Sequence, residues 1–136
     1  MNTYLSIQES VTWFNVGLIW VVQIIVYPQF RRVGATEFRV YHSDHCLRIG
    51  FIIVPLFLTE IATACWLFFE GLRSMPFLIS LAMFPVICLS TAIWQAPMHT
   101  RLANGRDDAV IRRLVLTNWV RTVAWSLRGI CLCFIV

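Results

Sequence analysis

The stretch that decides the fold is TNWVRTVAWSLR, residues 117 to 128, within an apolar segment at residues 114 to 136. Helical spacing places the following side chains in one stripe: Leu114, Asn118, Arg121, Trp125 and Arg128. An apolar segment of this length is expected to cross a bilayer, yet an ionised side chain at bilayer depth is expensive and needs a partner. We therefore expect the stripe to face the inside of a helical bundle, with its partners on other membrane-spanning helices.

The composition is that of a membrane protein. Of 136 residues, 59% are hydrophobic and only 13% are charged, about half of the ~25% usual in soluble domains. A soluble fold of this size could not bury so much apolar surface. All 11 basic residues are arginine and the net charge is +4, which in a membrane protein reflects topology and lipid contact. No basic patch interleaved with aromatic residues occurs on a polar segment, so no nucleic-acid partner is expected.

Three further apolar segments, at residues 11 to 30, 49 to 69 and 76 to 96, complete the pattern. Each has ~20 residues, enough to cross ~30 Å of hydrocarbon. Arginines concentrate in and beside the first and third polar connections, residues 33 to 48 and 97 to 108. The positive-inside rule places these connections in the cytoplasm. We predict an all-α integral membrane four-helix bundle, a single domain over residues 1 to 136, with both termini on the outer side of a bacterial inner membrane.

Glu60 is the only acidic residue within an apolar segment. At ~1.5 Å of rise per helical residue, it lies ~18 Å in from Arg48. Arg121 lies ~12 Å and Arg128 ~22 Å in from the same side. We expect Glu60 to pair with Arg121, with Arg128 or with both. Such a pair holds a bundle together whether or not chemistry occurs there, so a structural and a functional interpretation both remain open.

The histidines His42, His45 and His99 all map to the cytoplasmic side. If the helix before residue 49 runs unbroken into the second apolar segment, His42 and His45 share a face that looks into the bundle. Two histidines at i and i+3, a third from another helix, and Asp107 and Asp108 near it in sequence form a candidate transition-metal site. Iron, copper, zinc and manganese are all compatible. The alternatives are histidines that bond to headgroups or helix ends, and aspartates that cap the last helix.

The cysteines indicate no disulfide framework. They are odd in number and contain no CxxC motif: Cys46, Cys65, Cys88, Cys131 and Cys133. Four of them lie in apolar segments, where cysteine usually packs as a small hydrophobic side chain. Cys131 and Cys133 point to different sides of one helix, so we do not expect them to share a metal.

Three strings in the sequence form a common pattern. They are Tyr41-His42-x-x-His45-x-x-Arg48, Gln95-x-Pro97-x-His99-x-x-Leu102 and Asn118-Trp119-x-Arg121-Thr122. Together they resemble a family of small uncharacterised four-helix bacterial membrane proteins. More remotely, residues 95 to 122 resemble the DUF1772, or anthrone oxygenase-like, family. That resemblance implies oxidation of a lipophilic aromatic molecule by oxygen, with roles for His99, Asn118 and Arg121. His99 stands where that family often has asparagine.

These observations favour a membrane-embedded oxidoreductase or oxygenase-like protein that acts on a lipophilic substrate, aromatic or quinone-like. His42, His45 and His99 would bind a metal or move protons. Arg121 and Asn118 would stabilise an oxyanion such as a phenolate or enolate. Glu60 would hold Arg121 in place. The supporting side chains expected around this site are Gln23, Gln95, Asp107, Asp108, Trp125 and Arg128.

Two other functions fit the same sequence. One is a non-enzymatic subunit or assembly factor of a larger membrane complex, whose arginines bind lipid headgroups or the acidic groups of a partner. The other is a small transporter or channel subunit. It would have to form homo-oligomers because four helices hardly enclose a wide path, and the sequence lacks the broken-helix repeat that supports transport.

Overall fold

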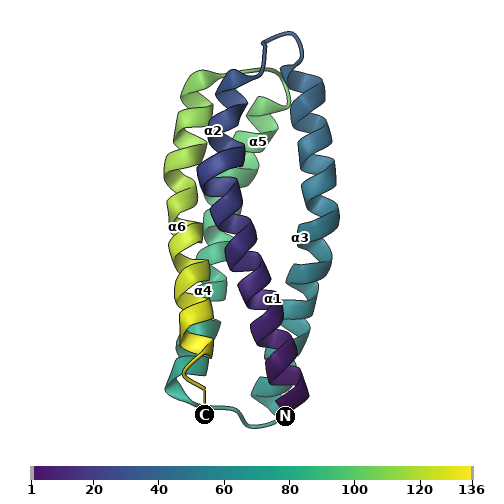
Figure 1. The fold of residues 1–136 in the computed structure, drawn as a ribbon. Coiled ribbons are helices and arrows are strands. Elements are labelled where there is room, and N and C mark those ends of the chain that lie inside the picture. The colour runs from purple at the N-terminus through teal and green to yellow at the C-terminus, as the bar shows by residue number, and fades with distance from the viewer. Residues whose placement is uncertain (1, 136) are drawn as a thin grey trace.

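The computed structural model describes residues 2 to 135 as four helical rods packed side by side (Figure 1). The first rod contains α1 (Asn2–Val21), η1 (Val22–Val26), α2 (Tyr27–Gln29) and η2 (Phe30–Arg32). The second rod is α3 (Phe38–Phe69). The third contains α4 (Met75–Ser90), η3 (Thr91–Gln95) and α5 (Ala96–Leu102), and the fourth is α6 (Asp108–Leu132). Both ends of the described chain lie at the same end of the bundle.

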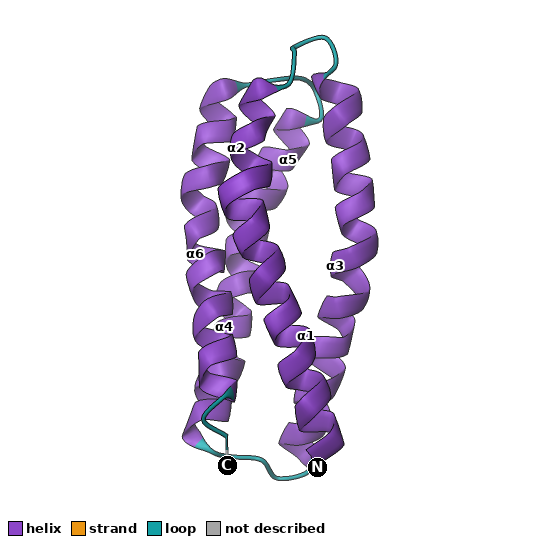
Figure 2. Ribbon diagram, viewed as in Figure 1, coloured by secondary structure: helices purple, strands orange, loops and turns teal. Residues whose placement is uncertain are grey.

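The prediction of an all-helical fold with four helices is confirmed for the described residues, whose connections are loops at the ends of the bundle (Figure 2). Three rods, at Thr3–Arg32, Phe38–Phe69 and Met75–Leu102, are long and apolar enough to cross a membrane. The helices are longer than the predicted segments, since the first begins at Asn2 and α3 includes most of the polar stretch before residue 49. Hydropathy marks only the apolar middle of a helix and misses its polar end turns.

The fourth rod, α6, is not among those three spans, yet it is the centre of the packing. It contacts α1, α2, α4 and α5. Close approach to α1 depends on Gly129, where a Cβ atom would lie 3.2 Å from Val16 Cγ2. The predicted stripe faces inward: Leu114, Asn118, Trp125 and Arg128 are buried, and Arg121 is partly buried. The polar side chains Asn118 and Arg128 of this stripe therefore contact protein.

The first and third rods each contain a π-helical turn, η1 and η3, which is followed after one residue by Pro28 or Pro97. Proline has no N–H, so the carbonyl one turn earlier loses its α-helical donor. A π turn accommodates this mismatch without ending the helix. Each extra residue in a turn rotates the following side chains by about 100°, which sets the directions of Tyr27 and His99.

One ion pair is fully buried, with side-chain exposures of 0% for Glu60 and 1% for Arg128. Arg128 Nη2 donates to Glu60 Oε2, and Arg128 Nη1 donates to Ser80 O at 3.0 Å. Gln8 Nε2 donates to the same carboxylate oxygen at 2.5 Å. The guanidinium carbon of Arg128 also lies 3.6 Å from the centroid of the Phe84 ring. The expected arginine partner of Glu60 is therefore Arg128.

Glu60 does not hold Arg121, and that sequence prediction is wrong. Among the described residues, no ion pair or hydrogen bond joins the two side chains. The remaining carboxylate oxygen of Glu60 accepts a hydrogen bond from Asn15 Nδ2 at 3.5 Å. Arg121 lies ~10 Å from Arg128 along α6, and its guanidinium donates to Asn118 instead.

We expect Arg128→Met to destabilise the protein by about 3 to 5 kcal/mol, because the Glu60 carboxylate would remain buried without a counter-charge. The double variant Glu60→Leu/Arg128→Met removes both charges and is expected to recover most of that loss. Denaturant unfolding of the protein in detergent micelles measures both changes.

The control for this prediction is Arg48→Met. The side chains of the Arg48–Asp44 pair are 78% and 58% exposed, and an exposed pair contributes at most about 1 kcal/mol. A double variant that is as unstable as Arg128→Met would contradict our account of the buried pair.

Candidate functional site

A cavity of about 540 Å³ lies between the rods. It forms because α3 packs mainly on α1 and only sparsely on α4 and α6, so the middle of the bundle is not filled. Aliphatic and aromatic side chains form much of its wall. The polar residues in the wall are Asn15, Tyr27, His45, Cys46, Thr91, Gln95, His99 and Arg121. This volume and this lining are typical of a binding site for a small organic molecule.

Three side chains with metal-donor atoms meet at the wall of this cavity. His42 Nε2 lies 3.0 Å from His99 Nδ1, and Cys46 Sγ lies 3.6 Å from His42 Nε2 and 3.7 Å from His99 Nδ1. With metal bonds of about 2.0 Å to nitrogen and about 2.3 Å to sulfur, tetrahedral coordination separates two nitrogens by about 3.3 Å and nitrogen from sulfur by about 3.5 Å. These donors, which we call the His-Cys-His triangle, therefore have nearly the spacing of a metal site.

The local structure explains how the triangle forms. His42 and Cys46 are four residues apart on α3 and project from the same face. The ring of His42 stacks on that of Phe38, with centroids 5.7 Å apart. Tyr27 Oη lies 3.0 Å from His99 Nε2. Metal-binding histidines usually have such a partner on their second nitrogen, and here it leaves His99 Nδ1 directed at the other two donors.

The triangle lies in a wall between two spaces. Cys46 and His99 line the central cavity and also a hollow of about 820 Å³ between α3 and α5. That hollow has a polar lining that includes Arg39 and Asp44. Side chains of the triangle therefore border both spaces.

His45 is not part of the triangle, contrary to the sequence prediction. Its ring packs against Phe30, with centroids 5.1 Å apart, and it forms part of the cavity wall. An α-helical turn holds 3.6 residues, so the residues at i+3 and i+4 from His42 point in different directions. The residue at i+4, Cys46, is the one that faces His99. Its spacing from His42 is a signal that the sequence prediction overlooked.

Asp107 and Asp108 do not belong to the triangle either. Asp107 Oδ1 accepts hydrogen bonds from Ala109 N at 2.9 Å and Val110 N at 3.1 Å, so it caps α6. Asp108 pairs with Arg106, whose Nε lies 2.9 Å from Oδ1. The hydrogen bonds from Arg106 hold the pKa of Asp108 below its usual range. The alternative interpretation of the aspartates, as groups that stabilise the start of the last helix, is confirmed for Asp107.

Of the predicted catalytic residues Glu60, Asn118 and Arg121, Arg121 is the one that lines the cavity. Its Nη1 donates to Asn118 Oδ1 at 3.3 Å, while its Nε is buried without a hydrogen-bond partner. Tyr27 lies in the wall of the same cavity. Among residues 2 to 135, Arg121 has no carboxylate partner. A cation with unused donor capacity therefore lies at the cavity.

Asn118 is fully buried and acts on Arg121 from behind the cavity wall. Its Nδ2 donates to Gln23 Oε1 at 2.9 Å, and Gln23 Nε2 donates to Val115 O at 3.1 Å. The chain of amides connects η1 to α6. Asn118 is thus a positioning residue, and Gln23 supports it.

The other predicted supporting residues divide between two places. Gln95 and Trp125 lie in the cavity wall, and Gln95 Nε2 donates to Thr117 Oγ1 at 3.2 Å. Arg128 belongs to the ion pair with Glu60 instead. Sequence reasoning missed Tyr27, the hydroxyl partner of His99, because no spacing or motif marks it.

Comparison of the chain with protein-family models, with curated proteins and with solved structures found no match. The resemblance to the anthrone oxygenase-like family therefore remains untested. The geometry of the cavity and of the His-Cys-His triangle is therefore what bears on function.

We expect the detergent-purified protein to retain one zinc or copper ion per chain after loading and gel filtration. Cys46→Ala and His99→Ala are each expected to lower metal affinity by roughly tenfold or more, because each removes a donor atom. Metal analysis of the eluted protein measures this.

The control variant is His45→Ala, which removes a neighbouring imidazole that lies outside the triangle and is expected to retain the metal. Equal losses for His45→Ala and His99→Ala would contradict the assignment of donors. A wild-type protein that binds neither metal would contradict the site itself.

Proposed function

We propose that this protein is a membrane-embedded, metal-dependent oxidoreductase that oxidises a lipophilic molecule with an aromatic or quinone-like ring. The observation that carries the proposal is that Arg121 and two members of the His-Cys-His triangle lie in the wall of one largely apolar cavity. Ligand sites of this kind use a few placed polar groups to orient a ligand that is otherwise held by apolar contacts. The oxygen-bearing part of the ligand would face Arg121 and the triangle.

The donor set narrows the choice of metal. One thiolate and two imidazoles suit copper or zinc better than manganese, and zinc has no redox chemistry. Three protein donors leave a coordination position open, as in catalytic zinc sites. A bound copper ion would supply electron transfer, with dioxygen as the oxidant that the resemblance to the anthrone oxygenase-like family implies.

The protein's own side chains would bind and orient the substrate. Arg121 would stabilise a phenolate or enolate oxygen, because its guanidinium has no acid partner among the described residues. Tyr27 would keep the His99 ring in place through its hydroxyl. The apolar wall would exclude water, which strengthens the interaction between Arg121 and an oxyanion.

We expect the copper-loaded protein in lipid nanodiscs to oxidise 2-decyl-1,4-benzohydroquinone to the quinone. The hydroquinone gives up two electrons and two protons, and dioxygen takes them up as hydrogen peroxide. Arg121→Gln is expected to lower kcat/KM by about 10²-fold while the protein keeps its metal. An oxygen electrode measures the rate.

Arg113→Gln is the control, because Arg113 is an exposed arginine of the same helix. Wild-type rates in Arg121→Gln, or unchanged rates in the metal-free protein, would count against the proposed enzyme. A stoichiometric partner that co-purifies with an inactive protein would favour the alternative of a non-enzymatic complex subunit.

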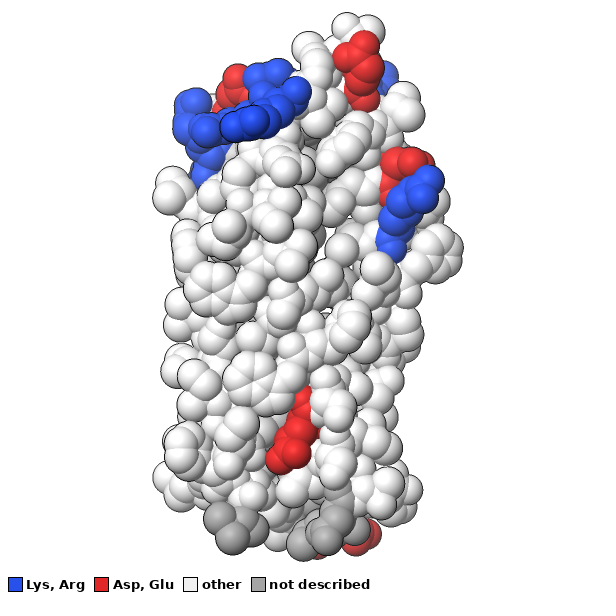
Figure 3. Space-filling view, in the orientation of Figure 1, with Lys and Arg blue, Asp and Glu red and all other residues white. Residues whose placement is uncertain are grey.

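The proposed location is a bacterial inner membrane, with the end opposite the termini in the cytoplasm. On the face in Figure 3, basic side chains gather toward that end and most of the side surface is uncharged. Arg31, Arg32, Arg112 and Arg113 lie beside the loops that join η2 to α3 and α5 to α6. The positive-inside rule then puts both termini on the outer side.

We expect alkaline phosphatase fused after residue 136 to be active and the same enzyme inserted at Asn104 to be inactive. This reporter needs disulfides, which form outside the cytoplasm and not within it. Phosphatase activity of whole cells measures the difference. The opposite pattern would reverse the proposed orientation.

A further inference from the structure

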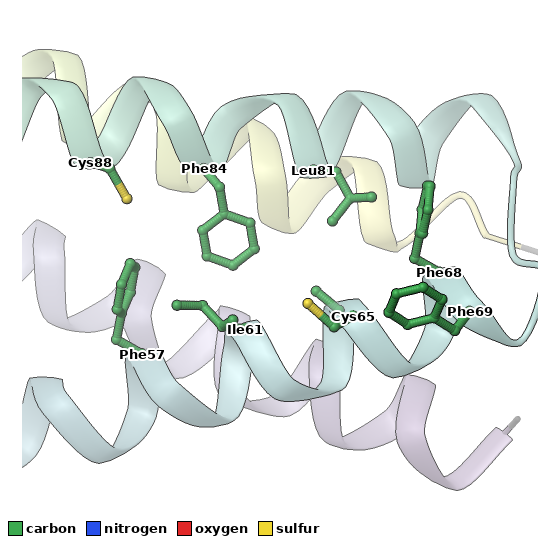
Figure 4. Close-up of a pocket in the computed structure, with 9 residues that line it drawn as sticks. Phe57, Ile61, Cys65, Phe68, Phe69, Leu81, Phe84 and Cys88 are labelled. Atoms are coloured by element: carbon green, nitrogen blue, oxygen red, sulfur yellow. The ribbon is translucent and has the colours of Figure 1, made fainter.

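A second, smaller space lies between α3 and α4 (Figure 4). It has a volume of about 320 Å³, and we call it the α3–α4 groove. Figure 4 shows Phe57, Ile61 and Cys65 of α3 opposite Phe84 and Cys88 of α4. Every residue in its wall is apolar or a cysteine. The groove therefore offers room to hydrocarbon and nothing to bind a polar group.

The groove adjoins the central cavity. Phe57 on α3 and Cys88 on α4 belong to the walls of both spaces. From Phe57 the groove follows α3 to Phe69, ~18 Å at the rise of a helix, in the direction away from His42 and Cys46. Its far end is open, since Phe69 is 84% exposed and Cys65 is also exposed. The two adjoining spaces together extend from the His-Cys-His triangle to the surface of the bundle.

The cavity and the groove differ in the polarity of their walls. Tyr27, His99 and Arg121 lie in the cavity wall, and the groove has only apolar side chains and cysteines. A long hydrocarbon tail gains little hydrophobic free energy by leaving lipid for an equally apolar groove. What the groove provides is space for a tail while the polar end of the same molecule stays in the cavity.

We propose that the substrate is a long-tailed amphiphile, with its oxygen-bearing ring in the central cavity and its hydrocarbon tail in the α3–α4 groove. This inference rests on the proposed function and adds the substrate's class: an alkylated or prenylated phenol or quinone of the membrane rather than a compact aromatic molecule. The ring reaches the cavity sideways from the bilayer, between Phe57 and Cys88.

Two photoprobes built on 4-dodecylphenol test this arrangement, one with a diazirine beside the ring and one with a diazirine at the end of the tail. After irradiation of the protein in lipid nanodiscs, mass spectrometry locates the adducts. Ring-end adducts are expected in the cavity wall, at residues such as Tyr27 and Trp125. Tail-end adducts are expected in the groove, at Cys65 and Phe69. An excess of unlabelled 4-dodecylphenol should suppress the groove adducts, and phenol without a tail should not.

Two variants are designed to obstruct the space that the tail would occupy. Cys88→Trp fills the junction and Ile61→Trp fills the groove itself, and each is expected to lower tail-end labelling of the groove at least fivefold. The control is Leu89→Trp, which adds the same side chain at an adjacent position of α4 that is 58% exposed and outside both walls. A tailless diazirine phenol should still label the cavity in Ile61→Trp and Leu89→Trp, which shows that they fold. Cys88→Trp obstructs the path of the ring itself, so its fold is checked by its retained metal.

The possible results distinguish a failure of the groove assignment from a failure of the proposed function. Tail-end adducts that are unchanged by both groove variants, or that spread equally over the lipid-facing Leu58 and Leu89, would overturn the groove assignment. Ring-end adducts in the cavity would in that case still support the proposed function. An absence of ring-end adducts from the wild-type cavity would count against the proposed function, and against this inference with it.

Discussion

A single buried carboxylate determines how the polar interior of this bundle is divided. Glu60 is bound to Arg128, and separating the two would leave an unpaired charge in an apolar core. Because that carboxylate binds Arg128, Arg121 has the Asn118 amide as its partner in place of an acid. The bundle therefore contains a neutralised layer near its termini and a cationic layer beside the cavity. The second layer is the one suited to binding an electron-rich oxygen.

Two departures from ideal helix packing turn this polar interior into a candidate site. The π turns η1 and η3 keep the first and third rods continuous through Pro28 and Pro97 and direct Tyr27 toward His99. The sparse packing of α3 on α4 and α6 leaves the cavity and the groove. The triangle combines both features, since two of its donors come from α3 and the third follows η3. Its metal would therefore lie where the least tightly packed rod meets a rod that contains a π turn.

The sequence was sufficient for features that depend on composition and helical period. These include the helices, the inward stripe of α6, the cap at Asp107 and an arginine partner for Glu60. The sequence was insufficient to choose between neighbouring positions of one helix, whose side chains differ by about 100° in direction. It was also insufficient to choose between two residues of one helix that lie at different depths in the bundle. Depth alone could not choose between Arg121 and Arg128, and spacing alone favoured His45 over Cys46. The cavity follows from how loosely whole helices pack, which no residue pattern records.

X-ray absorption spectroscopy of the metal-loaded protein tests the central claim, that His42, Cys46 and His99 hold one ion at the cavity wall. Our account predicts one sulfur neighbour at about 2.3 Å and imidazole nitrogens at about 2.0 Å from the metal. It also predicts that the sulfur signal disappears in Cys46→Ala. A coordination shell of nitrogen and oxygen alone in the wild-type protein, unaltered by that substitution, would contradict it.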